Sequence, residues 1–311
     1  MVLIRSLFLL IFITVALAQD VEDPEPDATQ SELDDQAIVS SVMYAPVPTN
    51  RIAVNRHQLP PPEYIATSGE QKTVCKNHRT DFSKDTTGWQ VENSMQDTYD
   101  IISNGLQFHL LSPSKYIRMH DQNNLPYNEI GGRGPTLNAT SYMRYGRVSA
   151  TLRSAGTGGA VTAFILMADG GDEIDFEFLG GDKDLVQSNY FWGQSKEYNV
   201  NGGIHKVEGG HIDTTFHKYT IDWKPDRIEW LVDDKVVRTR IRSETCDATG
   251  VCKFPSQPAR VQFGLWDGSI ESGTAEWSKG PIDWSAPQHG IQAFIKSVQV
   301  DCNPEYNQIV N

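Results

Sequence analysis

The stretch Gly171–Gly181, GDEIDFEFLGG, places an acidic residue at every second position: Glu173, Asp175 and Glu177. Strict alternation of polar and apolar residues over this length, closed by glycines, predicts a β-strand with one buried face. The three carboxylates then share one face, and the apolar residues between them face a core. Like charges set side by side on a sheet repel one another. Because this arrangement costs stability, it indicates a chemical role for the acidic residues.

Short alternating runs divided by Gly, Asn, Asp and Pro fill most of the remaining chain. Examples are GLQFHLL (105–111), YGRVSATLRS (145–154), AVTAFILMA (160–168), HKYTIDWK (217–224) and GIQAFIKSVQVD (290–301). An amphipathic helical pattern of useful length is missing from the sequence of this region. The runs predict an all-β fold, a two-sheet sandwich of jelly-roll type with a concave substrate groove, built as one domain over residues 73–304. Asp233-Asp234 is predicted as a hairpin turn between RIEWLV and KVVRTR.

The two ends of the chain carry different signals. A basic residue at Arg5, an apolar run from Leu7 to Leu17 and the small-x-small pattern that ends at Ala18 predict a secretory signal peptide over residues 1–18. Residues 19–72 are acidic and proline-rich, which predicts a disordered leader. Residues 305–311 are expected to form a short tail without an anchor signal. We therefore expect a secreted protein, outside the cell or in the cell wall, and no membrane attachment.

Net charge and motif content restrict the classes of molecule that the chain is expected to bind. The net charge is −13 and the isoelectric point is near 5.0, which argues against nucleic acid because no basic face is available to neutralise phosphates. Neither a phosphate-binding loop nor a metal-ligand spacing stands out, so we expect no cofactor and no metal. A monomer is expected.

The four cysteines are expected to form disulfides, because an exported chain meets oxidising conditions. Four cysteines allow three pairings. The short separation of Cys246 and Cys252, and the position of Cys75 and Cys302 at the two ends of the domain, favour these two pairs. A zinc site is disfavoured because there is no C-x-x-C pair. Asn138 begins an Asn-Ala-Thr sequon and is a candidate for glycosylation.

The acidic strand suits glycoside cleavage, which needs two carboxyl groups across one bond. Glu173 and Glu177 have Cα atoms roughly 13 Å apart in an extended strand, at ~3.3 Å per residue. Each side chain reaches about 4 Å, so the two carboxyl groups can approach to roughly 5–6 Å, close to the spacing of retaining enzymes. Asp175 lies between them, where it can hydrogen-bond one carboxylate and share its proton.

Aromatic and amide residues follow the acidic strand. Tyr190, Trp266 and Trp277 are candidate platforms for pyranose rings, and Gln187 and Asn189 are candidate hydrogen-bonding partners for sugar hydroxyls. Any single tryptophan is more often a core residue. Seven tryptophans, several of them in glycine-rich segments, favour a platform role for one or two.

These motifs carry a resemblance to family 16 glycoside hydrolases. Glu173–Glu177 is similar to the E-I-D-x-E signature of that family, and further matches follow in family order: 145–147, 187–191, 216–223 and 273–277. The match spans about Cys75 to Cys302. Within the family, the chain is most similar to the fungal Crh-type cell-wall transglycosylases, with plant xyloglucan endotransglycosylases as near relatives.

The resemblance implies a jelly roll, retention of anomeric configuration, Glu173 as the nucleophile, Glu177 as the acid/base and Asp175 as the assisting residue. It also implies that Gln187, Asn189 and Trp277 hold the sugar.

Crh-type members join chitin to β-glucan, so these polysaccharides are the expected donor and acceptor. A hydrolytic endo-β-1,3(4)-glucanase or a xyloglucan-active enzyme is the main alternative. A carbohydrate-binding sandwich without catalysis and an inert wall protein are the others.

Overall fold

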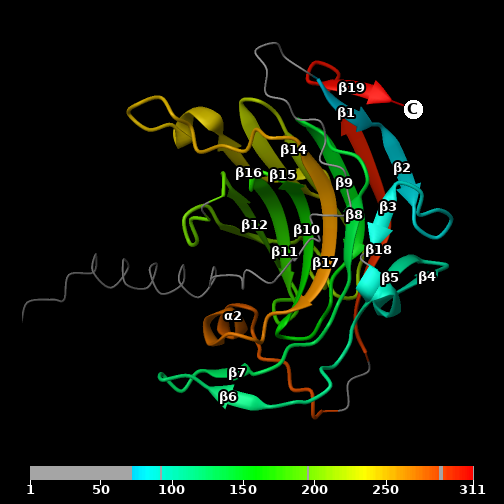
Figure 1. The fold of residues 1–311 in the computed structure, drawn as a ribbon, viewed down its shortest axis with the longest axis vertical. Coiled ribbons are helices and arrows are strands. Elements are labelled where there is room, and N and C mark those ends of the chain that lie inside the picture. Colours follow the sequence, from blue (N-terminus) through cyan, green and yellow to red (C-terminus); the bar gives the residue numbers. More distant parts are fainter. Residues whose placement is uncertain (1–71, 92, 195, 287–289, 311) are drawn as a thin grey trace, which may run out of the picture. The chain divides into compact units, whose positions relative to one another are not determined.

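The computed structural model describes residues 72–310, apart from 92, 195 and 287–289. The predicted signal peptide and the predicted leader up to residue 71 lie outside the described residues. Two β-sheets are stacked as layers in the described part of the chain, and their long strands curve together (Figure 1). The predicted all-β sandwich is confirmed.

The first sheet carries the acidic strand. Among the described residues it has seven strands, in the order β13 (Gly203–Lys206), β12 (Leu185–Phe191), β11 (Glu173–Leu179), β10 (Ala160–Ala168), β17 (Ala259–Asp267), β8 (Thr136–Ala139) and β3 (Trp89–Val91). The neighbouring strands are antiparallel. The acidic strand β11 is therefore an interior strand, bonded to β10 on one side and to β12 on the other.

The second sheet covers the apolar face of the first. Within the described part it has eight strands, in the order β16 (Lys235–Ile241), β15 (Arg227–Val232), β14 (His217–Trp223), β9 (Gly146–Arg153), β18 (Ile291–Cys302), β5 (Gly105–Leu110) and β4 (Tyr99–Ile102), with β2 (His78–Asp81) paired to β18. The predicted hairpin is confirmed between β15 and β16. Its turn residues Asp233 and Asp234 have φ of 48° and 64°, the positive values that a type I′ turn requires at both central positions.

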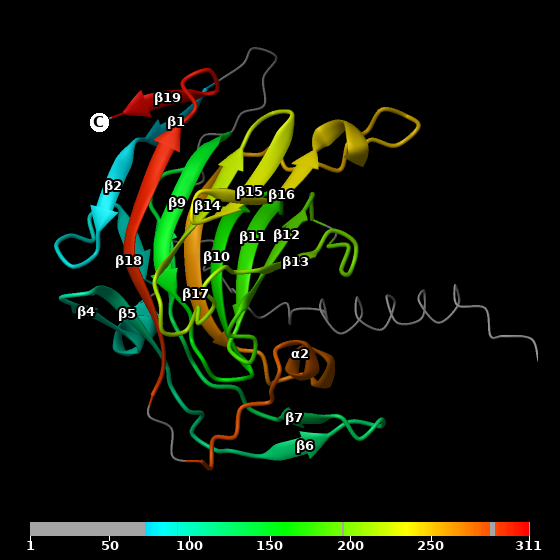
Figure 2. The same ribbon diagram turned by 180° about the vertical axis from the view of Figure 1, so that it is seen from behind.

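The remaining elements are short. They are the pairs β6 (Arg118–His120) with β7 (Pro126–Asn128) and β1 (Thr73–Lys76) with β19 (Asn307–Val310), the helix α2 (Ser272–Trp277), and the 3₁₀ turns η1 (Asn93–Thr98) and η2 (Arg242–Thr245). Both views place α2 beside β6 and β7 at one end, and β1 beside β19 at the opposite end (Figures 1 and 2). Because β19 pairs in parallel with β1, the boundary predicted at residue 304 is wrong: residues 307–310 belong to the fold.

The core lies between the two sheets and is rich in aromatic rings. Phe176 and Phe178 of β11 are fully buried and meet Tyr219 of β14 edge to face, with ring centroids 5.6 and 4.6 Å apart. Trp230 of β15 donates from Nε1 to the backbone oxygen of Asp175 at 3.0 Å. Each buried aromatic side chain contributes roughly 2–3 kcal/mol of apolar burial. The second sheet thus fixes both the side chains and the backbone of the acidic strand.

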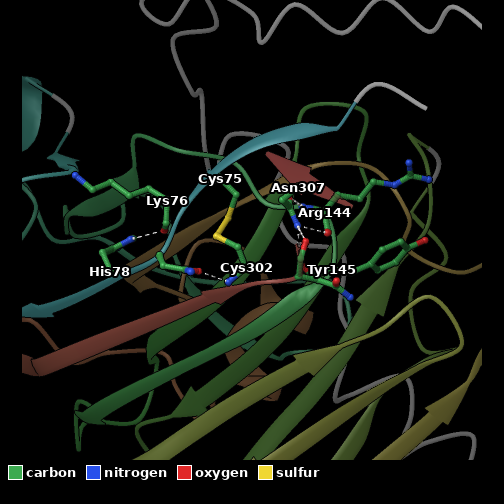
Figure 3. The surroundings of a disulfide bond; sticks show 9 residues. Cys75, Lys76, His78, Arg144, Tyr145, Cys302 and Asn307 are labelled. Carbon is green, nitrogen blue, oxygen red and sulfur yellow. Dashed lines mark hydrogen bonds between the residues drawn. A yellow bond between two sulfur atoms is a disulfide. The ribbon is translucent and has the colours of Figure 1, made fainter. Parts of the chain in front are cut away.

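Both predicted disulfides are present, Cys75–Cys302 and Cys246–Cys252. Figure 3 shows the first of them, which joins β1 to the end of β18. Asn307 lies close by and donates from its side-chain amide to the backbone oxygens of Arg144 and Tyr145, at 2.7 and 3.3 Å (Figure 3). A covalent bond and a buried amide together hold this end of the sandwich.

Candidate active site

The register of the first sheet gathers the predicted acids on one surface. Residues directly opposite one another on neighbouring strands share a face of the sheet. From β10 through β11 to β12, the rows on this face are Met167, Glu173 and Phe191; Ile165, Asp175 and Asn189; and Ala163, Glu177 and Gln187. We call this surface, which points away from the second sheet, the acidic face. It brings the three predicted acids together with two of the predicted amides.

The three carboxyl groups differ in exposure and in their partners. The side chain of Glu173 is 14% exposed, whereas Asp175 is 2% and Glu177 is 7% exposed. Burial, the negative charges of Glu173 and Glu177, and a hydrogen bond with Glu173 raise the pKa of Asp175 well above its usual range. The carboxyl group of Asp175 therefore holds a proton more readily than an ordinary aspartate, and that proton can be donated to Glu173.

Several buried polar atoms of the acidic face lack a hydrogen-bond partner among the described residues. They are Oδ1 of Asp175, Oδ1 of Asn189, Oε1 of Gln262 and Nε of Arg260. The register of β17 with β10 places Gln262 opposite Ile165 and Arg260 opposite Met167, so these atoms come from one surface. Buried polar groups in folded proteins are usually paired. These four atoms of the acidic face are therefore candidates for hydrogen bonds to a bound polar molecule.

Aromatic and amide groups also meet beside Glu177. Trp277 of α2 donates from Nε1 to Oε1 of Gln187 at 3.0 Å, and its ring stacks on that of Trp266, with centroids 5.9 Å apart and planes inclined by 22°. The structure therefore brings three predicted sugar-contacting residues together. Trp266 is partly exposed, whereas Trp277 is 2% exposed, so Trp266 offers more of its surface to a ligand.

Small residues lie next to Glu177 on the acidic face. Ala163 and Gly264 follow Glu177 in the same cross-strand row. A Cβ placed on Gly264 would have one described neighbour within 4 Å, the backbone oxygen of Pro135 at 3.8 Å. The rows on either side carry larger side chains, whereas Ala163 and Gly264 have almost no side-chain volume. This arrangement suits a sugar ring that lies across the strands.

A lysine and a pocket lie at the Glu173 end of the face. Nζ of Lys196 is 2.7 Å from Oε2 of Glu173 and donates to the backbone oxygen of Gly171 at 2.7 Å. It also lies 4.7 Å from the ring centroid of Phe191. Beyond Phe191 is a pocket of about 270 Å³, lined by Phe191, Trp192, Gly193, Gln194, Glu197, Asn201 and Lys253. Trp192 is 38% exposed.

Asp172, the residue before Glu173, ties two loops to the acidic strand. Its carboxylate is 2% exposed. Oδ1 accepts a hydrogen bond from the backbone N–H of Gly193 at 2.8 Å, and Oδ2 accepts from those of Ser256 and Gln257 at 2.7 and 3.0 Å. The side-chain amide of Gln257 adds a bond of 3.3 Å. Asp172 thus connects the start of β11 to Gly193, one of the residues that line the pocket.

Two sequence predictions differ from the structure. Tyr190 belongs to the core: it is 1% exposed, and its hydroxyl accepts a hydrogen bond from Nε of Arg240 at 3.2 Å. Since side chains alternate along a strand, Tyr190 faces away from Asn189 and Phe191, and its ring is no sugar platform. Asn138 is 7% exposed, and its Oδ1 accepts a 2.6 Å bond from Gln262. A glycan needs an exposed side-chain amide nitrogen, so the burial of Asn138 argues against the predicted glycosylation.

Several residues on or beside the acidic face were not predicted from the sequence. Arg260 and Gln262 alternate with the apolar residues of β17, and this period-two pattern could have revealed them. Asp172 directly precedes Glu173, and this position could have marked it as a fourth acidic residue of the site. Lys196 lies in a connection between strands, where periodicity carries no information about contacts.

Comparison with known proteins agrees with this geometry. The family model described as Glycosyl hydrolases family 16 matches residues 81–286. The chain belongs to this family. The family expected from residues 173–177 is therefore confirmed.

Relatives of this family 16 chain include two fungal proteins. It is 40% identical over 181 residues to Crh-like protein 2 of Aspergillus fumigatus, with 56% of this chain and 40% of the relative covered. It is 39% identical over 177 residues to Crh-like protein 3 of Botryotinia fuckeliana, with 54% and 39% covered. The chain spans about two fifths of the length of these curated relatives.

Solved structures of similar fold include two of particular interest. The Crh5 transglycosylase in complex with NAG is 28% identical, with a TM-score of 0.62 and coverage of 76% of this chain and 88% of that one. The β-glucanase of Bacillus licheniformis is 21% identical, with a TM-score of 0.56 and coverage of 74% and 99%, a likeness in fold.

Two kinds of feature are absent from the described residues. In that part of the chain no helix has the length and apolar character to cross a membrane. Likewise, no three or more His, Cys, Asp or Glu side chains there are placed to hold a metal ion.

Proposed function

We propose that this family 16 protein is a cell-wall glycan transglycosylase that works through a covalent glycosyl-enzyme with retention of configuration. The observation that supports this proposal is the placement of Glu173, Asp175 and Glu177 on one face of one strand, with Asp175, whose pKa is raised, hydrogen-bonded to Glu173. The similarity to Crh-like proteins and to the Crh5 transglycosylase supports transfer between polysaccharides. Chitin and β-glucan are the proposed donor and acceptor, and the proposed location is the cell wall.

The first half-reaction uses both outer carboxyl groups. A carboxylate oxygen of Glu173 attacks the anomeric carbon and forms a C–O bond, while the glycosidic C–O bond breaks. The electron pair passes to the leaving oxygen, which takes the proton of Glu177. The donor then remains attached to Glu173 as a neutral ester.

The second half-reaction reverses these roles. A hydroxyl oxygen of the acceptor attacks the anomeric carbon and gives its proton to the Glu177 carboxylate. The bond to Glu173 breaks and returns its electron pair to that carboxylate. Water in place of the acceptor gives hydrolysis, so the outcome depends on how well the site holds a sugar hydroxyl against water.

Asp175 supports both steps from between the two glutamates. Its proton hydrogen-bonds Glu173 and fixes the orientation of the attacking carboxylate. Keeping Asp175 uncharged also avoids a second negative charge, besides that of Glu173, next to Glu177, which must carry a proton in the first step.

Different residues are proposed to contact the sugar chain at the two ends of the acidic face. Gln187, Trp266 and Trp277 lie at the Glu177 end and are proposed to hold the ring beside the cut. Asn189, with Oδ1 unpaired among the described residues, is proposed to accept a hydrogen bond from a sugar hydroxyl. The pocket beside Trp192 at the other end is proposed to take a further unit of the chain.

The test uses fluorescent chito- and laminari-oligosaccharides, each with and without unlabelled chitin or xyloglucan. Products longer than the labelled input are expected. Glu173→Gln should abolish them, and Glu177→Gln should lower kcat by about 10²–10⁴-fold. Glu208→Gln is the matched control, since its side chain is 79% exposed.

Three outcomes would contradict the proposal. Shortened products alone would indicate the hydrolytic glucanase. Tight binding of an oligosaccharide that stays uncut would indicate a sugar-binding sandwich. Full activity of the Glu173→Gln protein would exclude Glu173 as the nucleophile.

A further inference from the structure

The ammonium group of Lys196 forms an ion pair with Glu173, the proposed nucleophile. Nζ of Lys196 is 2.7 Å from Oε2 of Glu173, and the two side chains are 24% and 14% exposed. The same ammonium is held by the backbone oxygen of Gly171 at 2.7 Å and lies 4.7 Å from the ring centroid of Phe191. A charged pair that is mostly removed from water interacts more strongly than a surface pair.

We propose that Lys196 is a positioning residue that acts through Glu173 and sets the balance between the two half-reactions. The inference rests on the proposed function. Glu173 is held from two directions, by the carboxyl group of Asp175 within its own strand and by the ammonium of Lys196 from the connection between β12 and β13. These contacts orient the carboxylate before a sugar arrives.

The charge of Lys196 affects the two steps in opposite directions. The first step turns the Glu173 carboxylate into a neutral ester, so a neighbouring ammonium that stabilises the carboxylate slows that step. The second step breaks the ester bond, and the electron pair returns to Glu173 facing Lys196. Stabilising the departing carboxylate speeds this step. Lys196 therefore shortens the lifetime of the glycosyl-enzyme.

A purely structural role for Lys196 explains less of the geometry. The connection between β12 and β13 is already held near its ends without this lysine. The backbone N–H of Gly193 donates to Asp172 at 2.8 Å, and Arg238 donates from Nη2 to the backbone oxygen of Asn201 at 2.7 Å. Lys196 adds the contact that reaches the nucleophile itself.

The experiment measures the fraction of protein present as glycosyl-enzyme during turnover. Wild type, Lys196→Met and Lys196→Arg are mixed with an oligosaccharide donor, quenched rapidly and analysed as intact protein by mass spectrometry. In Lys196→Met, the ratio of glycosyl-enzyme to free enzyme should rise by roughly tenfold, the change in relative rates that loss of one partly buried charge contact produces. Lys196→Arg should restore the wild-type ratio.

Lys183→Met is the control variant. Lys183 pairs with Asp213 at 3.1 Å, and Asp213 is 11% exposed, so this change removes a similar ion pair at another place in the fold. It should leave the ratio unchanged. Thermal unfolding of each variant identifies any that fails to fold, and Lys196→Gln then replaces Lys196→Met.

The possible failures are distinguishable. Wild type that forms neither product nor glycosyl-enzyme would overturn the proposed function. Active wild type with an unchanged ratio in both Lys196→Met and Lys196→Gln would overturn the role of Lys196 and leave the function intact. A similar rise in Lys183→Met would also overturn it, because the effect would then come from general destabilisation.

Discussion

Replacing Asp172 with alanine should destabilise the folded domain by about 3–5 kcal/mol. The carboxylate accepts four hydrogen bonds, three of them from the backbone N–H groups of Gly193, Ser256 and Gln257. Hydrogen bonds to a charged group contribute about 1.5–3 kcal/mol each. The sum exceeds the expected loss because the buried carboxylate also loses its hydration, a cost that alanine removes.

Urea unfolding followed by tryptophan fluorescence measures this loss directly. The thermal midpoint should fall by roughly 6–20 °C, since 1 kcal/mol corresponds to about 2–4 °C in a domain of this size. Asp172→Asn keeps one acceptor oxygen and should lose about half as much. The control is Asp226→Asn, at a side chain that is 69% exposed, with a change within about 0.5 kcal/mol. A loss below about 1 kcal/mol for Asp172→Ala would refute the view that this carboxylate joins the loops to β11.

Further expectations concern pH, the disulfides and the pocket. Because the pKa of Asp175 is raised above 3.8 in the folded state, this group's contribution to stability is full below about pH 4 and is lost as the pH rises toward the folded-state pKa. As the pH rises above about 4, Asp175→Asn should therefore become more stable relative to wild type in urea titrations. A difference in unfolding free energy that stays constant with pH would contradict this. Replacing both members of Cys75–Cys302, 227 residues apart, should cost roughly 5 kcal/mol, against roughly 2 kcal/mol for Cys246–Cys252, 6 residues apart; equal losses in the same titration would count against a chain-entropy origin. Trp192→Ala should raise KM for long oligosaccharides about fivefold, the equivalent of about 1 kcal/mol, and leave KM for the shortest substrates unchanged. Steady-state kinetics with oligosaccharides of increasing length measure this. The same change in KM at every length would show that the pocket binds no sugar.

Local pattern predicted the features that depend on alternation. The acidic face of β11 and the hairpin at Asp233-Asp234 follow from period-two polarity and turn chemistry, which act over a few residues. The disulfide pairing also followed, because the cysteines lie at the two ends of the domain and in one short segment. These constraints leave few alternatives for the chain.

Features that depend on register across strands could not be predicted. Tyr190 is one example, because its hydroxyl accepts a hydrogen bond from Arg240 on β16 in the other sheet. Asn138 carries a sequon, yet its pairing with Gln262 on β17 decides its burial. Lys196 meets Glu173 through a connection whose path no periodicity encodes. In each case the partner is distant in sequence or set by tertiary packing.

The interior position of β11 has a consequence for how the protein would lose activity on heating. Both proposed catalytic glutamates belong to a strand bonded on each side, whose backbone is also held by Trp230 from the other sheet. Fraying at an edge cannot separate them, so their amide protons should exchange with solvent only through opening of the whole sandwich. A partly inactivated sample should then be a mixture of fully competent and unfolded molecules, with the surviving fraction turning over substrate at its original rate.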